Sequence, residues 1–272
     1  MKVDFIIAGA MKCGTSSLSE ILSLHPDISF SNPKEPQFFS GTKDWEKNLN
    51  EYHSHFSKEG LIYGEGSTNY TKYPCFNLNI WDDIFEYNSK MKFIYLIRNP
   101  IDRIISHYTH IFESGLTNKP LEEAIITNPQ LLNISKYYTQ IIPYIRKFGK
   151  ENVLIILFED FVKNQLSITK EVLSFLNANP NKMPEIVKPV HANNSSEKKR
   201  PYRKYDQNLF PNLTKKISYR LWEKIYVPNN RFLLEKPKLS EKYKSIISNM
   251  LELEILAIQK LINKDLSHWF FY

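Results

Sequence analysis

FIIAGAMKCGTSSLSEIL, residues 5–22, joins three kinds of local pattern in one short stretch. A run of apolar residues typical of a buried strand is followed by a loop with glycines at 9 and 14, and then by apolar residues at helical spacing. Glycines let backbone N–H groups approach an anion, and the N-terminus of a helix attracts negative charge. The stretch therefore predicts a phosphate-binding or sulfate-binding loop between a buried strand and a helix.

The lysine of this loop does not follow the pattern of nucleotide triphosphatases. In the Walker A pattern G-x-x-x-x-G-K-[ST], lysine follows the second glycine. Here Lys12 lies between the glycines, and Thr15 follows Gly14 directly. The loop is either a damaged triphosphatase loop, an intact loop for another anion, or a tight turn with Lys12 in solvent.

Two further apolar runs, 93–97 and 153–158, are typical of strands covered on both faces. Helices are expected over 15–24, 100–112, 136–148 and 239–262. A chain of 272 residues can form one large core. We expect a single domain over residues 1–272, an α/β, P-loop-containing three-layer fold with a central, mainly parallel sheet flanked by helices. The face of the last helix that packs on this domain is predicted to carry Tyr243, Ile246, Ile247, Met250, Leu253, Ala257 and Leu261.

The strand over 93–97 ends in Arg98-Asn99-Pro100, where a P-loop ATPase would place an acidic residue that helps to hold Mg²⁺. A cation at this point argues against a metal and for a second anionic group on the ligand, because the planar guanidinium grips phosphate in two places. Ser106, two turns into the following helix, is predicted to share that phosphate. The alternative is that Arg98 forms a structural ion pair.

Composition narrows the classes of protein without choosing one. A net charge of +7 fits an anionic ligand, nucleic acid or a membrane surface, and equally a solvated surface without a partner. Two cysteines cannot supply a zinc ribbon or a disulfide framework. With no secretory signal and no segment of ~20 apolar residues, we expect a cytoplasmic protein without a membrane span.

The loop and the arginine junction together resemble the sulfotransferases that use 3′-phosphoadenosine 5′-phosphosulfate (PAPS), especially the Golgi carbohydrate and heparan sulfate enzymes and their bacterial relatives. Gly9–Thr15 matches their G-x-x-[KR]-x-G-T loop, and Arg98-Asn99-Pro100 with Ser106 matches their R-N-P junction. The resemblance implies that PAPS is the donor and that 3′-phosphoadenosine 5′-phosphate (PAP) is the product. It also implies that the donor is bound by Lys12, Cys13, Gly14, Thr15, Ser16, Ser17, Arg98 and Ser106.

The segments 34–39 and 64–70 extend this resemblance to the catalytic residues. Lys34–Phe39 matches the family's K-E-x-x-F-F segment, which supplies a catalytic glutamate. Residues 64–70 resemble its G-E-x-S-P-x-Y segment, with Thr68 in place of the proline. The resemblance implies that Glu35 takes the proton of the acceptor hydroxyl and that Lys12 stabilises the leaving group. Glu65 and then His107 are the alternative bases, and the residues expected to contact the acceptor are Lys34, Glu65 and Ser67.

The family's basic loop over the 3′-phosphate is not obvious, and Lys199 and Arg200 are the expected substitutes. The predicted reaction moves a sulfuryl group by in-line displacement, without a metal, to a hydroxyl of a small-molecule or glycan acceptor. The resemblance to carbohydrate enzymes favours a carbohydrate or a glycosylated metabolite. A P-loop metabolite kinase is one alternative, and a lipid or polyketide acceptor is another. An RNA-binding protein that uses the basic residues 198–205 is a third, and it is disfavoured because no ordered aromatic platform accompanies them.

Overall fold

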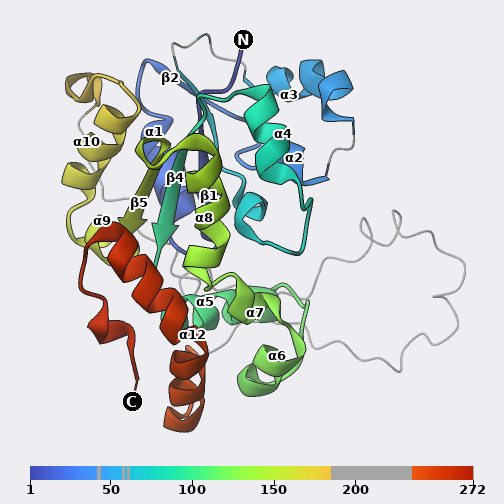
Figure 1. The fold of residues 1–272 in the computed structure, drawn as a ribbon, viewed down its shortest axis with the longest axis vertical. Helices are drawn as coiled ribbons and strands as arrows, with labels where there is room; N and C mark the ends of the chain where they lie inside the picture. The colour runs from blue at the N-terminus through green and yellow to red at the C-terminus, as the bar shows by residue number, and fades with distance from the viewer. Residues whose placement is uncertain (42–43, 57–58, 60–61, 185–234, 272) are drawn as a thin grey trace, which may run out of the picture.

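The computed structural model describes the chain except residues 42–43, 57–58, 60–61, 185–234 and 272 (Figure 1). Its described part contains a five-stranded sheet in the order β2-β3-β1-β4-β5, with every neighbouring pair parallel. The strands are β1 (Phe5–Gly9), β2 (Ile28–Phe30), β3 (Ile62–Glu65), β4 (Lys92–Ile97) and β5 (Val153–Leu157). The apolar runs of β1 and β4 are buried because both faces of the sheet are covered.

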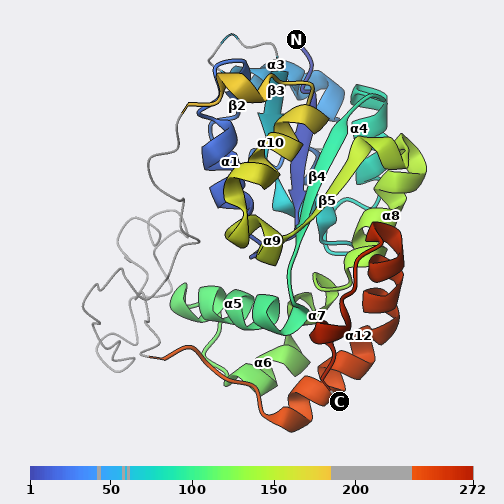
Figure 2. The ribbon, with the colours of Figure 1, turned by 90° about the vertical axis from the view of Figure 1, so that its left-hand side faces the viewer.

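Helices cover the sheet on both sides, which confirms the predicted three-layer α/β fold (Figures 1 and 2). One face is covered by α1 (Thr15–Leu22) and α10 (Gln165–Phe175), and the other by α4 (Ile80–Tyr87) and α8 (Tyr137–Phe148). Beyond the carboxyl ends of the strands lie α5 (Pro100–Glu113), α6 (Leu121–Thr127) and α7 (Gln130–Asn133). The remaining described α-helices are α2 (Phe38–Gly41), α3 (Leu49–Ser54), α9 (Phe158–Lys163) and α12 (Glu241–Ile262).

The start of α5 is the predicted one. The side chain of Asn99 accepts hydrogen bonds from the N–H groups of Ile101, at 3.0 Å, and Asp102, at 3.4 Å, and Pro100 occupies the first turn. These bonds satisfy N–H groups that have no partner inside the helix. The cap therefore fixes the point at which the chain leaves β4 next to Arg98.

The last helix is present as predicted, but the prediction of its packing face was only partly right. The apolar residues of α12 that are buried in the core are Ile247, Leu251, Ile255 and Ile258. Of the predicted face, Ile247 is among them, and Tyr243 and Leu261 are partly buried against the core. Several residues assigned to that face lie outside it, with Leu253 81% and Met250 58% exposed. The helix carries apolar residues around most of its circumference, so spacing alone did not identify the face that α8 covers.

Candidate active site

The loop between β1 and α1 lies at the carboxyl end of the central strand and has the backbone that an anion site requires. Gly14 precedes α1 with φ +90°, in the left-handed region that favours glycine. A Cβ atom at this position would lie 2.8 Å from the ring of Phe158. The N–H groups of the first turn of α1 have no partner inside the helix. Together with the hydroxyls of Thr15, Ser16 and Ser17, they form a ready cradle for an anion.

Lys12 and Arg98 belong to the same electrostatic environment. Burial lowers the pKa of the Lys12 ammonium, and the positive charge of Arg98 lowers it further, while Glu113 acts in the opposite direction. An anionic ligand at this place would favour the charged form of the Lys12 ammonium. Cys13, which follows Lys12 in the loop, is fully buried, and burial raises the pKa of its thiol to about 12. Cys13 therefore fills space under the loop and is no nucleophile.

Arg98 is held at the end of β4 by three contacts. Its guanidinium lies over the ring of Phe158, with 4.7 Å between the guanidinium carbon and the ring centre. It lies 3.8 Å from the carboxylate of Asp102 one turn further on, and the Tyr137 hydroxyl donates to its carbonyl at 2.7 Å. Ser106 is half-buried on α5. Because Phe158 also borders Gly14, one ring separates the two parts of the predicted donor site.

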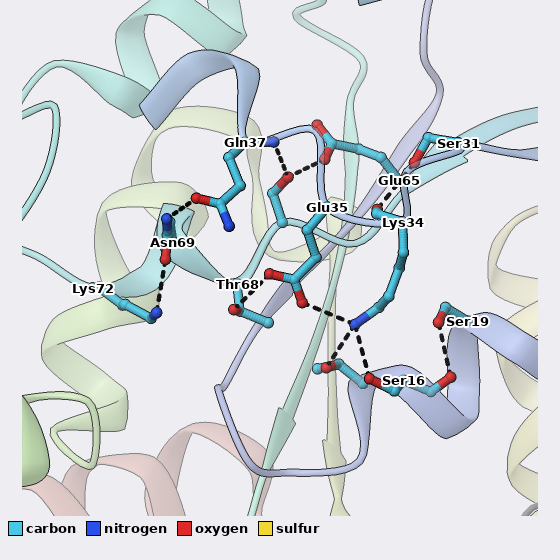
Figure 3. A network of polar contacts seen from close by, with 12 residues as sticks. Ser16, Ser19, Ser31, Lys34, Glu35, Gln37, Glu65, Thr68, Asn69 and Lys72 are labelled. Atoms are coloured by element: carbon cyan, nitrogen blue, oxygen red, sulfur yellow. Dashed lines mark hydrogen bonds and ion pairs between the residues drawn. The ribbon is translucent and has the colours of Figure 1, made fainter. Parts of the chain in front are cut away.

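The carboxylate of Glu35 contacts the neighbouring Lys34 and, from another segment, Thr68 (Figure 3). One carboxylate oxygen lies 3.0 Å from the ammonium of Lys34, which also donates to the hydroxyls of α1. The other oxygen accepts from the hydroxyl of Thr68 at 3.2 Å. A proline, which the family pattern has in place of Thr68, could not donate this bond. The departure from the pattern therefore supplies a hydrogen bond to the predicted base.

Glu65 and Ser67 lie deeper than the sequence predicted. Both side chains are fully buried, so neither is open to an acceptor in this structure. The Glu65 carboxylate accepts from Tyr52 at 2.8 Å, from Tyr70 at 2.9 Å and from Ser67. Ser67 in turn accepts from the N–H of Gln37 at 2.8 Å. Since Gln37 follows Glu35 by two residues, this buried network anchors the loop that carries the predicted base.

His107 is buried inside the fold rather than exposed in a cleft. Its Nδ1 atom lies 3.4 Å from the guanidinium of Arg103, which also donates to Ser135 at 2.6 Å and to the carbonyl of Leu131. Burial, with the charge of Arg103, lowers the pKa of His107 to about 2. A histidine this weakly basic is a poor general base near neutral pH.

Sequence patterns did not indicate the row of polar side chains beside Glu35. The Asn69 amide donates to the side chain of Gln37 and accepts from the ammonium of Lys72 at 2.7 Å (Figure 3). Burial lowers the pKa of the Lys72 ammonium, and the negative charge of Glu35 opposes this shift. Such residues come together only when η2 (Thr68–Thr71) folds beside α2, and neighbouring positions in the sequence do not reveal it.

The predicted phosphate-loop residues Lys199 and Arg200 lie outside the described residues. Within the described ranges, no group of three or more His, Cys, Asp or Glu side chains is placed to hold a metal ion. None of the helices described has the length and apolarity needed to cross a bilayer.

An α/β fold with a glycine loop at the end of its central strand and an arginine at the end of the next strand is a P-loop-type fold. Comparison with known families agrees: the model of the sulfotransferase domain matches residues 2–216, and the chain belongs to that family. A sulfotransferase from Alicyclobacillus acidocaldarius has the same fold, with a TM-score of 0.71, 22% identity and 99% of each chain covered.

The curated relatives are longer proteins, of which the chain matches a part. Carbohydrate sulfotransferase 15 of Mus musculus is 23% identical over 249 residues, which cover 65% of this chain and 44% of that protein. Luciferin sulfotransferase of Photinus pyralis is 26% identical over 190 residues, which cover 68% of this chain and 47% of that protein. Heparan sulfate glucosamine 3-O-sulfotransferase 5 of Mus musculus is 31% identical over 110 residues, which cover 40% of this chain and 30% of that protein. The chain thus spans less than half the length of these relatives.

Proposed function

We propose that this protein transfers a sulfuryl group from PAPS to a hydroxyl group of an acceptor, with Glu35 as the general base. The observation that carries the proposal is the position of the Glu35 carboxylate, which a single ammonium group separates from the first turn of α1. A base at this point can take the proton of a hydroxyl that attacks a sulfuryl group bound in the cradle. Membership of the sulfotransferase family supports the nature of the transferred group.

The 5′-phosphosulfate of the donor occupies the cradle formed by Lys12 and residues 13–17, and its 3′-phosphate meets Arg98 and Ser106. The acceptor oxygen attacks sulfur in line with the bond to the 5′-phosphate. The S–O bond to PAP breaks as the new S–O bond forms, and the acceptor proton passes to Glu35. Lys12 and the N–H groups of α1 stabilise the charge that develops on the leaving phosphate.

Glu35 is preferred over the other two candidates because of where those two lie. Glu65 is fully buried under Ser67 and two tyrosines, and His107 is held against Arg103 with a pKa of about 2. Glu35 is half-buried at the edge of the loop. We assign the acceptor as a carbohydrate or glycosylated metabolite, because the polar row of Gln37, Asn69 and Lys72 beside Glu35 suits a ligand rich in hydroxyl groups.

The test combines nucleotide binding with turnover. PAP should raise the melting temperature without added metal, and radiolabelled PAPS with a panel of glycosides, glycans and lipid alcohols should give a product heavier by one SO₃ group. Glu35→Gln should lower kcat by ~10²–10⁴-fold and still bind PAP. Glu20→Gln, which alters an exposed carboxylate on α1, is the control and should change neither. Normal turnover by Glu35→Gln would remove Glu35 from the mechanism.

A further inference from the structure

The ammonium group of Lys34 lies between the carboxylate of Glu35 and the first turn of α1 (Figure 3). Its Nζ atom lies 3.2 Å from the Thr15 hydroxyl and 3.3 Å from the Ser16 hydroxyl. Glu35, at 3.0 Å, is the carboxylate that pairs with it. A residue that sequence comparison placed next to the acceptor is thus in contact with the donor cradle.

The backbone around Lys34 fixes this direction. Its carbonyl accepts hydrogen bonds from the N–H of Gly66, at 3.0 Å, and from the hydroxyl of Ser31, at 3.0 Å. A Cβ atom on Gly66 would lie 2.9 Å from the Cε atom of Lys34. Because residue 66 has no side chain, the aliphatic part of Lys34 can pass over it toward α1. The position of the ammonium is therefore built into β3 and the segment after it.

The charges around Lys34 favour an anion bound between its ammonium group and the first turn of α1. The N-terminus of a helix carries a partial positive charge, so a cation is disfavoured there and an anion is favoured. Thr15 and Ser16 are neutral, and Glu35 also accepts a hydrogen bond from Thr68. An anion in the cradle would meet the N–H groups of α1 on one side and the Lys34 ammonium on the other.

We propose that Lys34 is a second cation of the donor site that binds the 5′-phosphosulfate end of PAPS together with Lys12. This inference rests on the proposed function and replaces a role for Lys34 in binding the acceptor. Lys34 then contacts the donor through its ammonium while remaining paired with Glu35. The base and the sulfuryl group are held at a fixed separation because both contact the same ammonium group.

The test compares two nucleotides that differ only in the 5′-phosphate: PAP and adenosine 3′-phosphate. Isothermal titration calorimetry of the wild type should give tighter binding of PAP, because the cradle receives no phosphate from adenosine 3′-phosphate. Lys34→Met should reduce this preference by about 10- to 100-fold, the effect of losing charge-assisted hydrogen bonds, and should leave the Kd of adenosine 3′-phosphate unchanged. Lys34→Arg keeps the charge and should retain most of the preference.

Lys182→Met is the matched control, because Lys182 also pairs with a carboxylate, that of Asp27 at 2.8 Å, but outside the site. It should leave the preference for PAP intact. If Lys34→Met keeps the wild-type preference, or loses affinity equally for both nucleotides, Lys34 does not bind the 5′ end and the inference is wrong. If the wild type binds neither nucleotide, the proposed function fails, and the inference fails with it. Thermal melting of each variant checks that the fold is intact.

Discussion

Replacing Arg98 with methionine should remove the part of nucleotide affinity that depends on the 3′-phosphate. The guanidinium is held in place before the ligand arrives, 4.7 Å above the Phe158 ring, and its side chain is only 18% exposed. The carboxylate nearest to it, on Asp102, lies 3.8 Å away and is about half exposed, so solvent weakens that competing pair. A phosphate can therefore take the guanidinium with little loss of an existing interaction.

A hydrogen bond to a charged group contributes ~1.5–3 kcal/mol, and each 1.4 kcal/mol changes an equilibrium constant tenfold. Arg98→Met should then raise the Kd of PAP by about 10- to 150-fold and leave the Kd of adenosine 5′-phosphate, which has no 3′-phosphate, within about twofold. Calorimetry with both nucleotides measures this. Arg146→Met, at an exposed position on α8, is the control. An equal loss for both nucleotides, or no loss for PAP, would refute the reasoning.

Two further predictions concern the loop and the buried carboxylate. Gly14→Ala should destabilise the protein by about 1–3 kcal/mol, measured by urea denaturation, and abolish PAP binding. The reason is that its Cβ would lie 2.8 Å from the Phe158 ring at a backbone φ of +90°. Gly115→Ala is the control: at φ +73° with open space around it, it should show only the smaller backbone effect. Burial raises the pKa of Glu65 from 4.5 to about 7. Between pH 4.5 and about pH 7 the folded state therefore binds a proton that the unfolded state has lost. The free energy of unfolding falls as the pH rises through this range, by about 3 kcal/mol in all. Urea denaturation at pH 5 and pH 8 should show this fall in the wild type and a smaller one in Glu65→Gln, and parallel pH dependences would contradict it.

Much of the scaffold was predictable because its signals are local. Strands β1, β4 and β5 are continuous apolar runs, and the N-cap Asn99 and Pro100 at the start of α5 are adjacent in the chain. The short strands β2 and β3 were not predicted. Neither has a pattern that stands out. β3 becomes a strand by pairing in parallel with β1, and β2 does so by pairing in parallel with β3. Pairing between distant segments is a tertiary property, and residues within one short segment cannot reveal it.

For the residues around Glu35, too, the motifs predicted roles, and only the fold showed which side chains are buried. The order of the motifs was enough to predict Lys12 and Glu35 as catalytic and Arg98 as a phosphate ligand. It could not show that Glu65 would be enclosed by Tyr52 and Tyr70, because those three residues meet only in the folded chain.

By itself, the sequence determined the family, the glycine loop between β1 and α1 and the position of the arginine junction, since each depends on residues close together in the chain. Only the tertiary structure decided that Lys34 reaches α1, that Glu65 supports the loop instead of facing the acceptor, and which face of α12 is buried. The physical reason is that burial and charge pairing depend on which distant segments come into contact. In this protein, the sheet order brings β3 and the segments beside it against the first turn of α1.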